Sequence, residues 1–80
     1  MMQHIVIKEI SNYLKCEPSD ISLDTLLEEL GIDSLGAITI LYELEERLDI
    51  EVPTEIFDDL HTVGDILTQL KTILALKNQA

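Results

Sequence analysis

Apolar side chains return at intervals of three and four residues in three stretches of this chain, the spacing of helices that bury one face. The first stretch predicts a helix over about residues 3–15. The last predicts a helix that begins near residue 63, where Thr62 and Asp65 form a capping-box-like pair with aspartate in place of glutamate. The apolar run at residues 4–7 could also suit a strand, but no second strand accompanies it.

The middle stretch predicts a helix over about residues 34–48, whose side chains fall into three groups when placed at steps of about 100°. The core stripe comprises Ala37, Ile40, Leu41, Leu44 and Leu48, and the exposed side comprises Thr39, Glu43 and Glu46. Leu35, Ile38 and Tyr42 form a second apolar strip. We expect this strip to be partly exposed as a partner surface, because a small bundle cannot readily bury two faces of one helix. The alternative is that the preceding loop covers it as ordinary core.

Proline-containing segments separate these helices. A Glu-Pro pair after the first helix opens a connection that is long for one without a full helix, which is typical of functional segments. In it, Ser22 is predicted to cap a brief turn that carries three leucines into the core: Leu26, Leu27 and Leu30. After Pro53, Thr54 is predicted to cap a short helix through residue 60.

These elements predict an all-α fold, an antiparallel four-helix bundle with three main helices and one short third helix. We expect a single domain over residues 1–80.

Charge is concentrated in the middle of the chain. The net charge is −11, and residues 17–69 hold 15 of the 16 acidic residues but only one of the five basic ones, Arg47. Such a field disfavours nucleic acid and anionic lipid and favours partners with basic docking surfaces, although it could also serve solubility alone. Without a membrane-length apolar run or a secretion signal, and with only Cys16 as cysteine, we expect a cytoplasmic monomer.

The chain lacks the pattern of an enzyme. A nucleophilic serine needs a base within hydrogen-bond reach, and neither His4 nor His61 has a spacing that demands a position beside Ser34. Neighbouring acids such as Glu28 and Glu29 diverge by about 100° on a helix. No group of side chains has zinc-ligand spacing.

Ser34 is the candidate functional residue because it falls in the first turn of the middle helix. Free backbone N–H groups and the helix dipole accommodate a phosphate at that position. This placement favours a serine that carries a phosphate ester over one that performs acyl chemistry. The alternative is that Asp33 or Ser34 is only an N-cap.

Residues 33–53, DSLGAITILYELEERLDIEVP, resemble the acyl carrier proteins of fatty acid and polyketide synthesis. The resemblance includes the Asp-Ser-Leu triplet, the Leu-Glu-Glu of residues 44–46 and the Ile-Glu-Val-Pro of residues 50–53, and it extends to residues 26–31 and 62–65. It implies that a phosphopantetheinyl transferase moves 4′-phosphopantetheine from coenzyme A onto Ser34. The terminal thiol would then hold acyl intermediates as thioesters for synthase enzymes.

Two positions depart from the pattern of fatty acid synthesis, which generally has acids where this chain has Gly36 and Thr39. Their absence indicates a specialised fatty acid or polyketide-type pathway, and Gly36 also predicts a helix start that can fray. An aminoacyl or peptidyl carrier and an unmodified acidic adaptor remain alternatives. The expected partner-binding residues are Asp33, Leu35, Ile38, Tyr42, Glu45 and Glu46.

Overall fold

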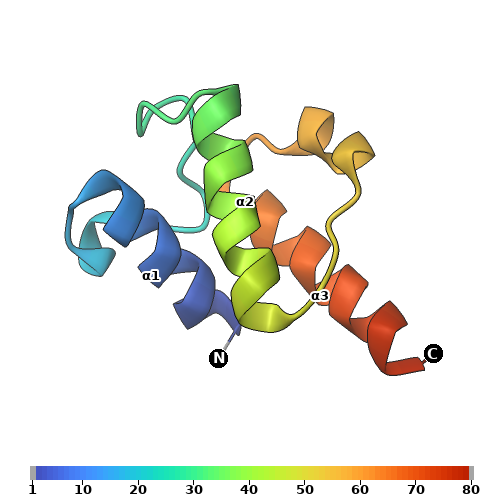
Figure 1. Cartoon of the computed structure of the whole chain (residues 1–80). Coiled ribbons are helices and arrows are strands. Elements are labelled where there is room, and N and C mark those ends of the chain that lie inside the picture. Colours follow the sequence, from blue (N-terminus) through green and yellow to red (C-terminus); the bar gives the residue numbers. More distant parts are fainter. Residues whose placement is uncertain (1, 80) are drawn as a thin grey trace.

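The structure, a computed structural model, describes residues 2–79. It contains three long helices, α1 (Met2–Leu14), α2 (Ser34–Leu48) and α3 (Val63–Gln79), and a short 3-10 helix, η2 (Thr54–Asp59) (Figure 1). These elements confirm the predicted all-α fold with three main helices and one short third helix. A further 3-10 turn that the sequence did not predict, η1 (Pro18–Asp20), follows α1.

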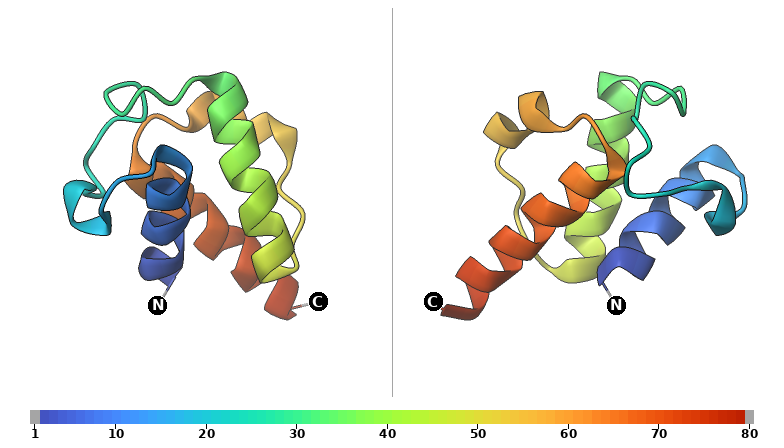
Figure 2. Two further views of the ribbon diagram at one scale, coloured as in Figure 1. Left: turned by 60° about the vertical axis from the view of Figure 1, so that its left-hand side comes forward. Right: turned by 180° about the vertical axis from the view of Figure 1, so that it is seen from behind.

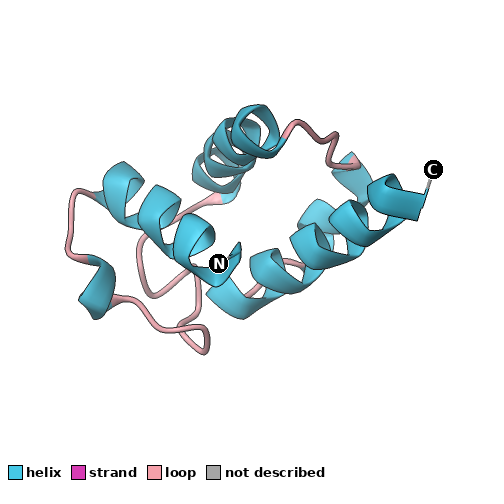
Figure 3. Cartoon of the chain, turned by 90° about the horizontal axis from the view of Figure 1, so that it is seen from below, coloured by secondary structure: helices cyan, strands magenta, loops and turns pink. Residues whose placement is uncertain are grey.

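Helix α1 runs antiparallel to both α2 and α3 (Figures 1 and 2). The connection after α1 leads to the upper end of α2 in Figure 1, and η2 returns the chain toward that same end before α3 begins. Seen from below, the three long helices are arranged around one centre (Figure 3). The start of α2, the connection before it and η2 are therefore gathered at one end of the molecule.

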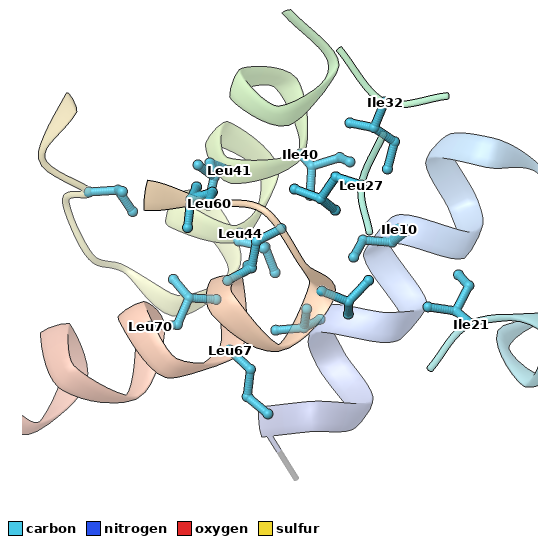
Figure 4. Close-up of a cluster of buried hydrophobic side chains, with 14 of the residues drawn as sticks. Ile10, Ile21, Leu27, Ile32, Ile40, Leu41, Leu44, Leu60, Leu67 and Leu70 are labelled. Atoms are coloured by element: carbon cyan, nitrogen blue, oxygen red, sulfur yellow. The ribbon is translucent and has the colours of Figure 1, made fainter. Parts of the chain in front are cut away.

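Aliphatic side chains from all three long helices fill the core (Figure 4). The largest of those that are fully buried include Ile10 of α1, Ile40, Leu41 and Leu44 of α2, and Ile66 and Leu70 of α3. Each side chain of this size stabilises the fold by roughly 1.5–3 kcal/mol when it is buried. The predicted stripe of α2 is confirmed, with Ala37 and Leu48 at its ends only partly buried.

Backbone hydrogen bonds attach the long connection before α2 to the residues at the start of α3. The bonds run from Leu27 N–H to the His61 carbonyl (2.8 Å), from Val63 N–H to the Thr25 carbonyl (3.1 Å) and from Gly64 N–H to the Leu23 carbonyl (2.8 Å). A β-carbon at Gly64 would lie 3.0 Å from the Leu23 oxygen, so this close approach favours glycine. The connection is thus held in place by segments about forty residues away in sequence.

Three expectations about these connections are wrong. Leu26 is 41% exposed because it sits in an isolated bridge with Thr62 at the surface, whereas Leu27 is buried and Leu30 partly buried. The hydroxyl of Thr25 accepts the N–H of Ser22 (3.3 Å), so Thr25 and not Ser22 supplies the side-chain cap of that turn.

The third error concerns Thr54, which is the first residue of η2 and not its cap. The preceding Pro53 occupies the cap position without a side-chain hydrogen bond. Proline restricts its own φ to about −65°, and Pro53 has a φ of −62°.

Candidate functional site

Asp33 and Ser34 play different structural parts at the start of α2. Asp33 is the N-cap, and its Oδ1 accepts the backbone N–H of Gly36 at 2.8 Å. Ser34 is the first helical residue and is exposed, and among residues 2–79 its hydroxyl has no hydrogen-bond partner. Because the aspartate performs the capping, the serine hydroxyl stays accessible from solvent.

A tight turn places this pair at the surface. Gly31 has a φ of +78°, in the left-handed region that glycine adopts without strain, and its N–H donates to the Glu28 carbonyl at 3.0 Å. The next residue, Ile32, is buried and anchors the turn in the core. The chain leaves the core directly after Ile32, so Asp33 and Ser34 emerge at the start of the helix.

Gly36 is buried, and residues 34–36 are helical in the structure. A β-carbon at this position would lie 2.8 Å from the Tyr13 hydroxyl, 3.2 Å from Ile32 Cγ2 and 3.3 Å from Asp33 Oδ1. The first turn of α2 is thus both capped and packed against α1. Glycine at this position lets the tyrosine hydroxyl approach the helix backbone closely.

A hollow of about 560 Å³ lies beside Ser34. It is bordered by the start of α2, the connection before it and the residues of η2, which the fold brings to the same end of the molecule. Its apolar lining consists of Leu26, Leu27, Ile32, Ala37, Ile38, Phe57 and Leu60. A flexible group attached to Ser34 could therefore fold back onto a surface that is apolar in part.

The second apolar strip of α2 is exposed, as expected, except in its middle. Leu35 is 74% and Tyr42 64% exposed, so the connection before α2 does not cover them. Ile38 is partly buried and lines the hollow. Of the acids beside the strip, Glu46 is exposed and Glu45 partly buried. The expected partner-binding residues therefore form a surface that continues from Ser34 along α2.

Basic side chains do not neutralise this surface. Arg47 forms an ion pair with Glu9 of α1, whose side chain is only 8% exposed. Lys77 of α3 donates to the carbonyl of Asp49, and its Nζ lies 3.3 Å from Asp49 Oδ2 at the far end of α2. Among residues 2–79, no ion pair involves the acids around Ser34.

The predicted capping box of α3 is confirmed. Asp65 Oδ2 accepts the N–H groups of His61 (2.8 Å) and Thr62 (2.9 Å), and Asp65 N–H donates to Thr62 Oγ1 at 3.1 Å. The backbone N–H groups of Thr62 and His61 hold the pKa of Asp65 below its ordinary value, because they stabilise the ionised carboxylate.

The structure also places His61 on the hollow that borders Ser34. The spacing of these two residues in the sequence gave no reason to expect this proximity. The proximity follows from the backbone pairing of residues 23–27 with residues 61–64. This pairing is a tertiary contact, which spacing along the chain does not predict. His4 lies on α1 and is exposed.

The described part of the chain contains no group of His, Cys, Asp and Glu side chains placed to hold a metal ion. None of its helices is long and apolar enough to cross a membrane.

An exposed serine on a capped helix, beside a partly apolar hollow and an acidic surface, is an arrangement that suits a protein carrying a tethered group. Comparison with known proteins agrees: residues 4–70 match the family described as "Phosphopantetheine attachment site". An acyl carrier protein of Streptococcus pyogenes is 30% identical over 70 residues, covering 88% of this chain and 86% of that protein. One of Wolinella succinogenes is 34% identical over 68 residues, covering 82% and 90%.

A non-reducing polyketide synthase of Byssochlamys spectabilis is 38% identical over 61 residues, which is 76% of this chain and 3% of that protein. The chain belongs to the acyl carrier protein family. Members of this family carry covalently attached 4′-phosphopantetheine, and they are carriers and not catalysts.

Proposed function

We propose that Ser34 carries 4′-phosphopantetheine and that the chain holds acyl intermediates as thioesters on this arm. The observation that supports the proposal best is the division of tasks in the first turn of α2. Asp33 caps the helix, and the exposed hydroxyl of Ser34 is left without a competing hydrogen bond among residues 2–79. The helix N-terminus at this point favours the phosphate that would join the arm to the serine.

Mass spectrometry after loading tests the attachment site. Incubation with coenzyme A, magnesium and a promiscuous phosphopantetheinyl transferase should add one phosphopantetheine group to the wild-type chain. Ser34→Ala should abolish the addition and keep its helical circular dichroism, while Ser22→Ala, at another exposed serine, should still be loaded. A wild type that stays unmodified would favour an unmodified acidic adaptor.

We also propose a specialised fatty acid or polyketide-type pathway. Positions 36 and 39, a glycine and a threonine, place no acid near Ser34. Gly36 is packed under Tyr13, and the exposed Thr39 hydroxyl donates to the Leu35 carbonyl at 2.9 Å. The similarity to a polyketide synthase is consistent with this assignment. Acylation assays with fatty acyl, polyketide extender and aminoacyl loading enzymes would separate it from an aminoacyl or peptidyl carrier.

The partner surface in this proposal is the exposed part of α2 and its cap: Asp33, Leu35, Ile38, Tyr42, Glu45 and Glu46. Its partners would be the transferase and acyl-loading and synthase enzymes with basic docking surfaces. We place this activity in a single domain over residues 1–80 that acts as a cytoplasmic monomer.

Tyr42 and Leu44 allow docking to be separated from folding, because one is exposed and the other fully buried. The free energy of unfolding of Tyr42→Ala should lie within about 0.5 kcal/mol of the wild-type value. The same substitution should nevertheless slow phosphopantetheine or acyl transfer by partner enzymes. Leu44→Ala should cost about 2–5 kcal/mol of unfolding free energy. Transfer rates and urea unfolding measure the two effects, and an unchanged transfer rate for Tyr42→Ala would remove Tyr42 from the surface.

A further inference from the structure

We propose that His61 holds the phosphopantetheine arm at the rim of the hollow by donating an imidazole N–H to an oxygen of the arm. The proposal rests on the attachment of this arm to Ser34. Both Ser34 and His61 line the same hollow, although about thirty residues separate them in the sequence. An arm that starts at Ser34 and folds onto the apolar lining would reach the region of His61.

The backbone of His61 is fixed on both sides. Its N–H donates to Asp65 Oδ2 at 2.8 Å, and its carbonyl accepts the N–H of Leu27 at 2.8 Å. These bonds join the residue to the capping box of α3 and to the connection before α2. The position of its α-carbon relative to the hollow is therefore set by the fold.

The imidazole itself remains available. It is exposed, and among residues 2–79 it has no hydrogen-bond partner. Asp65 is the acid whose charge interacts with it, but Asp65 Oδ2 already accepts the two backbone N–H groups of the capping box. An imidazole carries at least one N–H in either protonation state, so it can donate to a ligand without gaining a proton.

The hollow is lined by acids but by no permanently charged base, and the Thr54 hydroxyl is its other uncharged donor besides Ser34. Glu28, Asp33 and Asp58 line the hollow, whereas no lysine or arginine does. The phosphate and the amide carbonyls of the arm are hydrogen-bond acceptors, and ionised carboxylates cannot donate to them. His61 is the one residue of this lining whose side chain can both donate a hydrogen bond and carry a positive charge.

The test compares the two histidines of the chain by nuclear magnetic resonance before and after loading of Ser34. The ring proton resonances of His61 should move when the arm is attached, and those of His4 on α1 should not. Contacts from the His61 ring to pantetheine protons would indicate the amide oxygens as acceptors. A phosphorus shift that differs between wild type and His61→Phe would indicate the phosphate.

A second measurement follows the arm through its exposure to solvent. In the acyl-loaded protein, His61→Phe should raise the rate of thioester cleavage by hydroxylamine roughly twofold to tenfold, since one hydrogen bond is lost. His61→Gln, which restores an N–H donor, should recover part of the protection, and His4→Phe should have no effect. These substitutions leave the backbone bonds of residue 61 in place.

The outcomes separate the two proposals. A chain that gains no mass under loading conditions would overturn the proposed function and this proposal with it. Two results would overturn only the role of His61. One is a loaded chain whose His61 resonances stay unchanged, and the other is a thioester on His61→Phe that hydroxylamine cleaves at the wild-type rate.

Discussion

Single side chains decide whether the key hydroxyl of this protein is accessible. At the start of α2 an aspartate satisfies the helix N-terminus, so Ser34 remains exposed. At the start of α3 the hydroxyl of Thr62 is used in the capping box and is engaged by Asp65 N–H. Two helix starts with similar residue types thus differ in which hydroxyl is left free, because different residues accept the free N–H groups.

The capping box makes a prediction about pH. The pKa of Asp65 is lowered in the folded state by the backbone N–H groups of Thr62 and His61, so folding favours the ionised carboxylate. The resulting stability is present above the pKa of the unfolded chain and is lost as the pH falls through the folded pKa. Asp65→Asn should therefore lower the urea midpoint at neutral pH and reduce its decline on acidification.

Urea unfolding followed by circular dichroism across the acid range measures this effect. Asp59→Asn is the matched control, because Asp59 is an exposed acid at the end of η2 to which no backbone N–H among residues 2–79 donates. If both variants lost stability with pH as wild type does, the capping box would contribute nothing to acid unfolding.

Contacts between elements decide how the attachment site is supported. Helix α1 approaches the first turn of α2 through Tyr13, whose hydroxyl occupies the space that a side chain at Gly36 would need. A second link between these helices is the ion pair of Glu9 with Arg47. Helix α2 is therefore held to α1 near both of its ends, while its opposite side remains available to partners.

The contact between Tyr13 and Gly36 predicts a non-additive pair of substitutions. Gly36→Ala would ordinarily gain up to about 1 kcal/mol of helix propensity. In this protein the new methyl would meet the Tyr13 hydroxyl at 2.8 Å, so we expect no gain in the wild type. In a Tyr13→Phe background the gain should reappear in part, with a coupling of about 0.5–1 kcal/mol.

A double-mutant cycle on the free energy of unfolding gives this coupling. Tyr42→Phe is the control for loss of a tyrosine hydroxyl, because Tyr42 is exposed and none of its atoms is among those nearest to a β-carbon at Gly36. Equal effects of Gly36→Ala in the wild-type, Tyr13→Phe and Tyr42→Phe backgrounds would contradict a contact at this position.

At the scale of the molecule, like charges oppose the compact state. The net charge is −11, and among residues 2–79 the cations in ion pairs are Arg47, which engages Glu9, and Lys77, which engages Asp49. The acids around Ser34 have no such partner in the described range. Their repulsion acts over distances that salt shortens to about 10 Å at 0.1 M.

Added salt or millimolar divalent cations should therefore raise the melting temperature. A gain of about 1 kcal/mol would correspond to roughly 4–8 °C in a domain of this size. Thermal unfolding in increasing sodium chloride measures the effect, with an uncharged osmolyte as the control for general solvent effects. A melting temperature that changed neither with sodium chloride nor with divalent cations would show that these acids lie too far apart to repel one another.

The local sequence pattern was sufficient for much of the fold. It predicted both ends of α1 and α2 and the start of α3 to within one or two residues, the buried stripe of α2 and the capping box of Thr62 and Asp65. The C-terminal end of α3 was not predicted, and the helix continues to Gln79. These features depend on residues a few positions apart, since helix periodicity and capping are local. The same local reasoning identified Ser34 as a candidate, because a helix start can be recognised from its neighbours.

Tertiary contacts decided the rest. The exposure of Leu26, the packing of Gly36 under Tyr13 and the arrival of His61 beside the hollow all depend on segments about twenty to forty residues apart. The spacing of residues along the chain contains no information on which such segments meet. Packing and backbone pairing select one arrangement of the helices, and only that arrangement sets the surroundings of Ser34.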